Sequence, residues 1–157
     1  MTTDVSATAN VNTDEQLATS TVVATTIGAV AILVSGWVHF YLYFRGGYRG
    51  IAPDSVLGLT ISRSFALNAI TAVVLAEALV LGLRYRALLL PAAALGAGFG
   101  VATLVAYFLS RTRGLLGFEE TATTTEAVIG MAAEAIAIVA LVPVMLTELR
   151  ARRRPAR

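Results

Sequence analysis

The sequence predicts an all-α fold: an integral membrane four-helix bundle. Two observations support this. Of the 157 residues, 57% are hydrophobic and only 14% are charged, whereas soluble domains carry about 25% charged residues. The apolar residues also fall into four blocks of about 20 residues, the length at which a helix crosses roughly 30 Å of hydrocarbon. These blocks are residues 21–44, 64–83, 87–109 and 127–146. None shows the two-residue alternation of a membrane β-strand.

The domain layout follows from these blocks. Residues 1–20 are polar and rich in threonine, alanine and asparagine, which predicts a disordered tail. Residues 21–146 form the bundle, and residues 147–157 form an arginine-rich tail. Cysteine is absent, which excludes disulfides and thiolate chemistry.

The basic residues indicate which membrane holds the protein and on which side of it the termini lie. All 12 basic residues are arginine, and with so much alanine this is typical of a GC-rich bacterial genome. We therefore expect a multi-pass protein of the bacterial cytoplasmic (inner) membrane. Four spans put both termini on one side, which carries seven arginines against five on the other. The positive-inside rule then favours cytoplasmic termini.

The first span, residues 21–44, carries the only histidine of the chain. Residues at helical spacing form one stripe on this span: Thr25, Gly28, Ile32, Ser35 and His39. Small side chains on such a stripe let helices pack closely. We therefore expect His39 to point into the bundle, roughly 10 Å from the midplane at 1.5 Å per residue.

Three roles for His39 stay open. It is a hydrogen-bonded packing residue, a proton relay or quinone contact, or a haem ligand. One histidine cannot form a bis-histidine haem site within one chain, so haem requires a second copy of His39 or a partner such as Met131. Zinc requires more nitrogen or sulfur ligands than exist here. No metal and no cofactor is predicted.

Arginines flank the spans. Arg45 and Arg49 lie in the loop after the first span, and Arg152, Arg153 and Arg154 lie in the C-terminal tail. Such clusters suit lipid phosphates or another anionic group. The simpler interpretation of the first loop is an interfacial anchor.

The second span, residues 64–83, contains Asn68 and Glu77. Nine residues separate them, which places them on opposite faces of a helix. This counts against a single polar pore through one chain, and it permits one face to point inward and the other toward a partner chain.

The third span, residues 87–109, contains Gly96 and Gly100 in a G-x-x-x-G pattern. This pattern marks a close-packing face, either within one chain or between chains. Tyr107 lies near the same end as His39 and Asn68, so these three residues are expected to form a polar layer.

The fourth span, residues 127–146, contains Glu134, which like Glu77 lies within roughly 5 Å of the midplane. A carboxylate there is costly, so it should face the bundle interior, be paired or be protonated. If Glu77 and Glu134 face each other, they can share a proton. One interpretation is a proton or cation site. The other is a pair of interhelical hydrogen bonds, each worth about 1 kcal/mol or less.

Short matches suggest an internal repeat. Tyr41 and Arg45 have the same spacing as Tyr107 and Arg111, and "LAEAL" at 75–79 is similar to "AAEAI" at 132–136. Two parallel-repeat helix hairpins would produce this pattern. Short matches in alanine-rich helices also arise by chance.

The segments "HFYLYFRGGYRGI", "LGLTISRSFALNA" and "GLLGFEE" resemble small four-helix integral membrane proteins common in actinomycetes. The resemblance covers about residues 25–146 and implies no known reaction. The layout is also similar to DoxX-like membrane proteins, but no DoxX motif matches residue by residue.

These observations favour a non-enzymatic membrane protein, either an accessory subunit or a small transporter that handles protons through Glu77 and Glu134. The alternative is a redox component that binds haem or quinone near His39. The expected partners are the lipid bilayer and a homo-oligomer or larger membrane complex. Nucleic acid is not expected as a partner.

Overall fold

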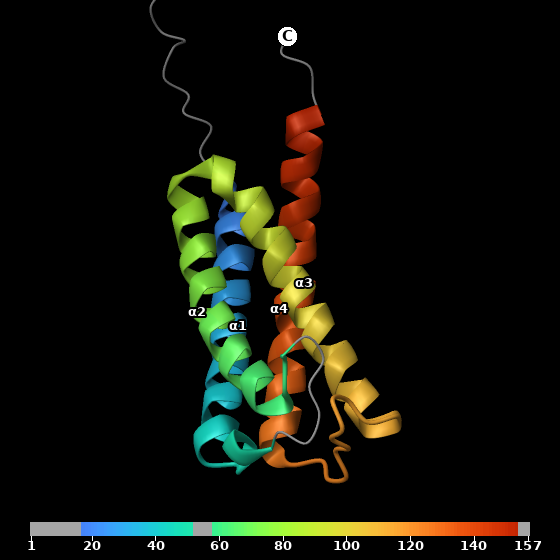
Figure 1. Ribbon diagram of the computed structural model, residues 1–157. Coiled ribbons are helices and arrows are strands. Elements are labelled where there is room, and N and C mark those ends of the chain that lie inside the picture. Colours follow the sequence, from blue (N-terminus) through green and yellow to red (C-terminus); the bar gives the residue numbers. More distant parts are fainter. Residues whose placement is uncertain (1–16, 52–57, 154–157) are drawn as a thin grey trace, which may run out of the picture.

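The computed structural model describes residues 17–51 and 58–153. Its helices are α1 (Thr19–Phe44), the 3-10 turn η1 (Tyr48–Gly50), α2 (Ile61–Arg84), α3 (Arg86–Thr112) and α4 (Thr125–Arg153) (Figure 1). The predicted all-α four-helix bundle is confirmed. No strand occurs in the described ranges.

The helices extend beyond the predicted spans. α1 begins at Thr19, within the predicted N-terminal tail, and α4 continues to Arg153, well into the predicted C-terminal tail. Residues 1–16 and Arg154 lie outside the described residues. The start of α2 is fixed by Thr60, whose side chain accepts a hydrogen bond from the backbone N–H of Arg63 at 3.2 Å.

The helices alternate in direction, and each one packs on two neighbours. α1 lies against α2 and α4, and α3 completes the ring by packing on the same two helices. The start of α1, the turn at Tyr85 and the end of α4 lie at one end of the bundle, here called the tail end (Figure 1). η1 and the α3–α4 connection (residues 113–124) lie at the other end, here called the loop end.

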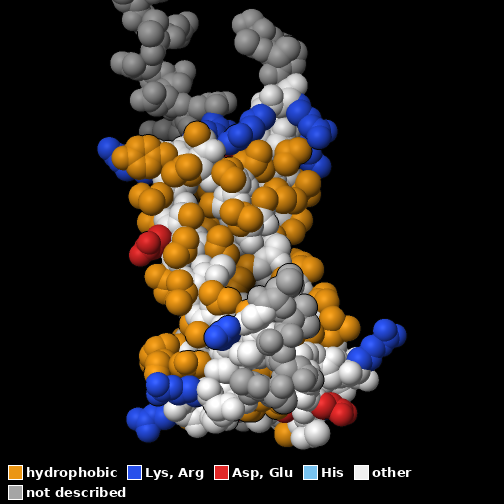
Figure 2. All heavy atoms as spheres, viewed as in Figure 1, with side chains coloured by type: hydrophobic (Ala, Val, Ile, Leu, Met, Phe, Trp, Pro, Cys, Tyr) orange, Lys and Arg blue, Asp and Glu red, His pale blue; other side chains and the backbone are white. Residues whose placement is uncertain are grey.

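All four long helices are apolar and long enough to cross a membrane. Large hydrophobic side chains such as Val139, Trp37 and Leu95 are exposed on the outside of the bundle. Figure 2 shows hydrophobic side chains covering the middle of the visible face, with arginines toward both ends. An apolar exterior with charged ends is the pattern expected in a bilayer. The chain is a small multi-pass membrane protein.

The core is built from aliphatic side chains that interlock around glycines. Ile32, Leu79, Leu89 and Leu141 are fully buried. An added Cβ at Gly28 would lie 2.4 Å from Leu141 Cδ2, and one at Gly96 would lie 2.7 Å from Leu141 Cδ1. The side chain of Leu141 therefore occupies the space that both glycines leave open.

Gly100 allows the backbones of α3 and α4 to approach each other. An added Cβ there would lie 3.0 Å from the backbone carbonyl of Glu134. Like Gly28 and Gly96, Gly100 thus faces a neighbouring helix of the same chain. The sequence left open whether these glycines pack within a chain or between chains, and their contacts here are intramolecular.

Arginines at the tail end join α4 to the start of α3. Arg86 pairs with Glu148 at 3.2 Å, and Glu148 is 2% exposed. Arg152 donates to the backbone carbonyl of Ala87 at 2.9 Å, and its neighbour Arg153 is exposed. At the loop end, Arg45 and Arg49 are exposed, as lipid contact requires.

The positions that suggested an internal repeat have different environments. Tyr41 is exposed whereas Tyr107 is half-buried, and Glu77 is exposed whereas Glu134 is 4% exposed. The two hairpins, α1–α2 and α3–α4, therefore do not place their matching residues equivalently.

Candidate functional site

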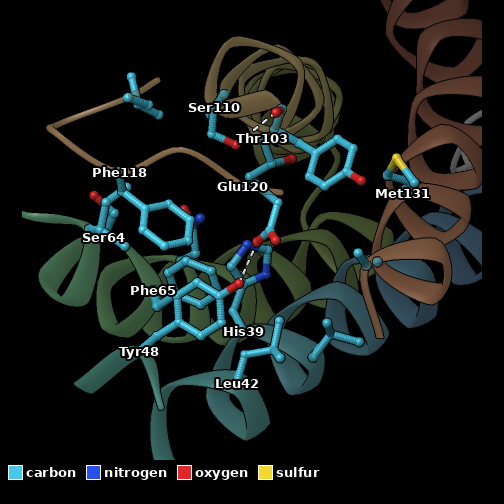
Figure 3. Close-up of a pocket in the computed structure, with 18 of the residues that line it drawn as sticks. His39, Leu42, Tyr48, Ser64, Phe65, Thr103, Ser110, Phe118, Glu120 and Met131 are labelled. Carbon is cyan, nitrogen blue, oxygen red and sulfur yellow. Dashed lines mark hydrogen bonds between the residues drawn. The ribbon is translucent and has the colours of Figure 1, made fainter. Parts of the chain in front are cut away.

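A cavity of about 120 Å³ lies between the four helices at the loop end. η1 and the α3–α4 connection form its outer wall (Figure 3). Side chains with polar atoms contribute to its lining from all of these elements, among them His39, Tyr48, Asn68, Thr103, Tyr107, Glu120 and Glu134. No arginine is among the described residues that line it.

Glu134 forms the inner wall of this cavity. Its side chain is almost completely buried, and its Oε1 accepts a hydrogen bond from Ser35 Oγ at 2.9 Å. Among the described residues, no basic side chain forms an ion pair with it. Thr103 of α3 also places its hydroxyl beside this carboxyl group. A carboxylate has about four acceptor positions, so the two hydroxyls leave part of its hydrogen-bonding capacity unused.

Ser35 also positions His39. The backbone carbonyl of Ser35 lies 2.9 Å from His39 Nδ1. Because a carbonyl can only accept, we assign the proton to Nδ1, and the neutral ring then has a free lone pair on Nε2. One residue of α1 thus holds both the imidazole, through its carbonyl, and the carboxyl group of Glu134, through its hydroxyl. Nε2 has no hydrogen-bond partner within the described ranges.

The sequence singled out five buried polar residues, and four of them line this cavity: His39, Asn68, Tyr107 and Glu134. Ser35 was assigned only to the packing stripe of the first span. Its spacing of four residues from His39 was the available signal, because both then lie on one helix face.

Glu77 lies elsewhere. It is exposed on the outer face of α2, whereas Glu134 faces the interior. The possibility that the two glutamates face each other and share a proton is therefore not realised in this bundle. The reason is rotational: Leu75, Ala76 and Leu79 form the buried face of α2, and Glu77 falls outside it.

Aromatic rings close the outer side of the cavity. Tyr48 stacks on Phe65 with ring centroids 4.3 Å apart, and Phe118 packs edge-on against Tyr48 with ring centroids 5.5 Å apart. Figure 3 shows these three rings beside His39, whose ring lies 5.2 Å from Phe65.

A hydrogen bond joins the two segments of this outer wall. Tyr48 donates its hydroxyl to Glu120 at 2.5 Å, and Glu120 is itself held by its backbone N–H, which donates to the carbonyl of Ser110. Burial, and then the bond to Glu120, raise the pKa of Tyr48 above its ordinary value. The tyrosine therefore keeps its proton. No sequence pattern connects residues 48 and 120.

The cavity is rich in hydrogen-bond acceptors. Ser64, Thr103 and Ser110 donate their hydroxyl protons to carbonyls of their own helices or caps, at 2.8 to 3.0 Å. While these bonds are kept, their oxygens accept hydrogen bonds from anything inside the cavity. With Glu134 and His39 Nε2, they give the site a negative or electron-rich character.

The chemistry available here is binding and proton exchange. In the described part of the chain, no group of three histidine or acidic side chains is placed to hold a metal ion.

Comparison of the chain with protein-family models, with curated proteins and with solved structures finds no match in any of the three. The resemblance to small actinomycete membrane proteins stays a prediction.

Proposed function

We propose that this chain is a non-enzymatic protein of the bacterial cytoplasmic membrane that takes up and releases a proton or cation at Glu134. It would act as a small transporter or as the accessory subunit of a larger membrane complex. The observation that carries this proposal is the buried carboxyl group in the wall of a cavity, with Ser35 as its hydrogen-bond donor.

Energetics favours a functional role over packing alone. An ionised carboxylate near the centre of a membrane helix costs about 2.5–3.5 kcal/mol. An interhelical hydrogen bond returns about 1 kcal/mol or less. The hydrogen bond between Ser35 and Glu134 therefore stabilises the α1–α4 contact by less than the ionised carboxylate destabilises it. Exchange of a proton or cation through the cavity would explain why a glutamate occupies this position.

Access to Glu134 is one-sided in this conformation. The cavity extends toward the loop end, where Thr124 of its lining is exposed. Toward the tail end, the bundle is filled by Ile32, Leu79 and Leu141. Transport to the other side would therefore require a second conformation in which these apolar side chains separate.

Glu134 shares its surroundings with other titratable groups. His39 of α1, Tyr48 of η1, Tyr107 of α3 and Glu120 of the α3–α4 connection line the same cavity. α2 contributes Asn68 and Ser64, which do not titrate. An experiment on Glu134 must therefore separate its signal from that of Glu120.

Infrared difference spectroscopy of the purified protein makes this separation. We expect a carboxylic C=O band that grows as the pH falls and that disappears in Glu134→Gln. The same band should persist in Glu77→Gln and Glu120→Gln, which serve as matched controls. A spectrum whose pH-dependent bands are unchanged by Glu134→Gln would contradict the proposal.

The proposed orientation places both termini in the cytoplasm, because Arg150, Arg152 and Arg153 lie at the tail end. The cavity would then open toward the periplasm. A C-terminal reporter that works only in the cytoplasm should be active. A C-terminal reporter that works only in the periplasm should be inactive. The reverse result would invert the orientation.

A redox role is the second candidate, and one observation favours it. His39, whose Nε2 is free of hydrogen bonds within the described residues, lines the same cavity as Met131. Histidine and methionine together are a known haem ligand pair, and a quinone carbonyl could accept from Asn68 or Tyr107. Either ring system would require the cavity of about 120 Å³ to widen. A Soret band in the absorption spectrum of the purified protein would favour haem over proton handling.

A further inference from the structure

The cavity at Glu134 has walls of two kinds. Its polar positions are mostly hydrogen-bond acceptors, and its remaining surface is apolar, formed by side chains such as Leu42, Phe65 and Met131. A ligand that fits both must donate hydrogen bonds and carry a hydrocarbon group.

The acceptors exclude several classes of ligand. Two acidic side chains and no arginine line the described cavity, so an anion would be repelled. The hydroxyl protons of Ser64, Thr103 and Tyr48 are already donated to other oxygens. An acceptor ligand would therefore find few donors, chiefly Asn68 and Tyr107.

We propose that this cavity binds a small protonated amine, whose ammonium group donates to Glu134, Thr103 and His39 Nε2 while its hydrocarbon part lies against the apolar wall. This inference rests on the proposed function and names the cation. An ammonium group has three donors for these acceptors. The cavity volume of about 120 Å³ limits the ligand to a small molecule.

The test uses the full chain in detergent and isothermal titration with propylammonium. We expect saturable binding that is at least about tenfold weaker in Glu134→Gln, which corresponds to about 1.4 kcal/mol. Glu77→Gln is the matched control and should bind as the parent does, because Glu77 is on the outer face. Thr103→Val, which keeps the side-chain shape, should weaken binding without removing the charge.

Three further probes give the chemical class. 1-Propanol has the same number of heavy atoms without the charge, tetramethylammonium has the charge without N–H donors, and potassium has neither donors nor a hydrocarbon part. We expect none of the three to compete with propylammonium. Equal binding of propanol would show that the cavity selects only for apolar groups. Equal binding of tetramethylammonium or potassium would show that binding does not depend on N–H donors of the ligand. Any of these results overturns the proposal.

The results that would contradict amine binding differ from those that would contradict proton handling at Glu134. If propylammonium does not bind but the infrared band of Glu134 still titrates, the amine is wrong and proton handling stands. If Glu134→Gln binds propylammonium as tightly as the parent chain does, Glu134 is not the counter-ion and the amine proposal is wrong. If neither binding nor titration is observed, both proposals are wrong.

Discussion

Replacing Glu134 with glutamine is expected to reduce proton or cation flux through reconstituted vesicles to the level of protein-free vesicles. Glutamine keeps an oxygen that can accept from Ser35 Oγ, which now lies 2.9 Å from the carboxyl group. It cannot exchange a proton or carry a negative charge. Stability should therefore change by about 1 kcal/mol or less, while function is lost.

Vesicles that contain a pH-sensitive dye measure this flux. The matched control is Glu77→Gln, which removes an acid from the same membrane region but from the outer face of α2. It should leave flux unchanged. Equal loss in both variants, or flux that survives in folded Glu134→Gln, would show that the buried carboxyl group is not the exchange site.

The contrast between the two glutamates shows what the sequence could predict. Depth follows from position along a helix, and both acids were placed near the midplane. Rotation about the helix axis is harder to predict, because lipid and core are both apolar and hydrophobic periodicity loses its contrast. In α4, alanines occur both on the buried face with Glu134 and on the outer face. The sequence pattern therefore does not indicate which face of α4 points into the bundle.

The stripe on α1 was more informative because its small and polar residues stand out against valine and isoleucine. Thr25, Gly28, Ile32 and Ser35 are all buried. His39 follows at the same spacing and lines the cavity. Here the residues that differ from lipid-facing side chains mark the face that packs against protein.

Pairs between distant segments could not be predicted. The bond from Tyr48 to Glu120 and the ion pair between Arg86 and Glu148 each join residues more than 60 positions apart. The sequence placed all four residues near membrane surfaces, where many partners are possible. Which partners meet depends on the order of helices around the bundle, and that order is a property of the whole fold.

Substitution of the packing glycines is the second large expected effect. Gly96→Leu and Gly100→Leu should each lower the free energy of unfolding by about 1–3 kcal/mol or more, because new side chains overpack the interior. At Gly96, even a Cβ would lie 2.7 Å from Leu141 Cδ1 and 2.9 Å from Ile32 Cδ1. At Gly100, the nearest atoms lie at 3.0 Å and include the backbone carbonyl oxygen of Glu134, which cannot move without α4.

Gly98→Leu is the control, because it makes the same change in the same helix at an exposed position. Beyond its own helix backbone and chain neighbours, nothing lies within 4 Å of an added Cβ at Gly98, so the new side chain would extend into lipid. Its effect on stability should lie within about 0.5 kcal/mol, as for other surface substitutions. Helix loss during detergent denaturation, followed by circular dichroism, compares the three variants. Equal stability of all three would mean that α3 does not pack through Gly96 and Gly100, and that the cavity beside Glu134 is not bounded as described.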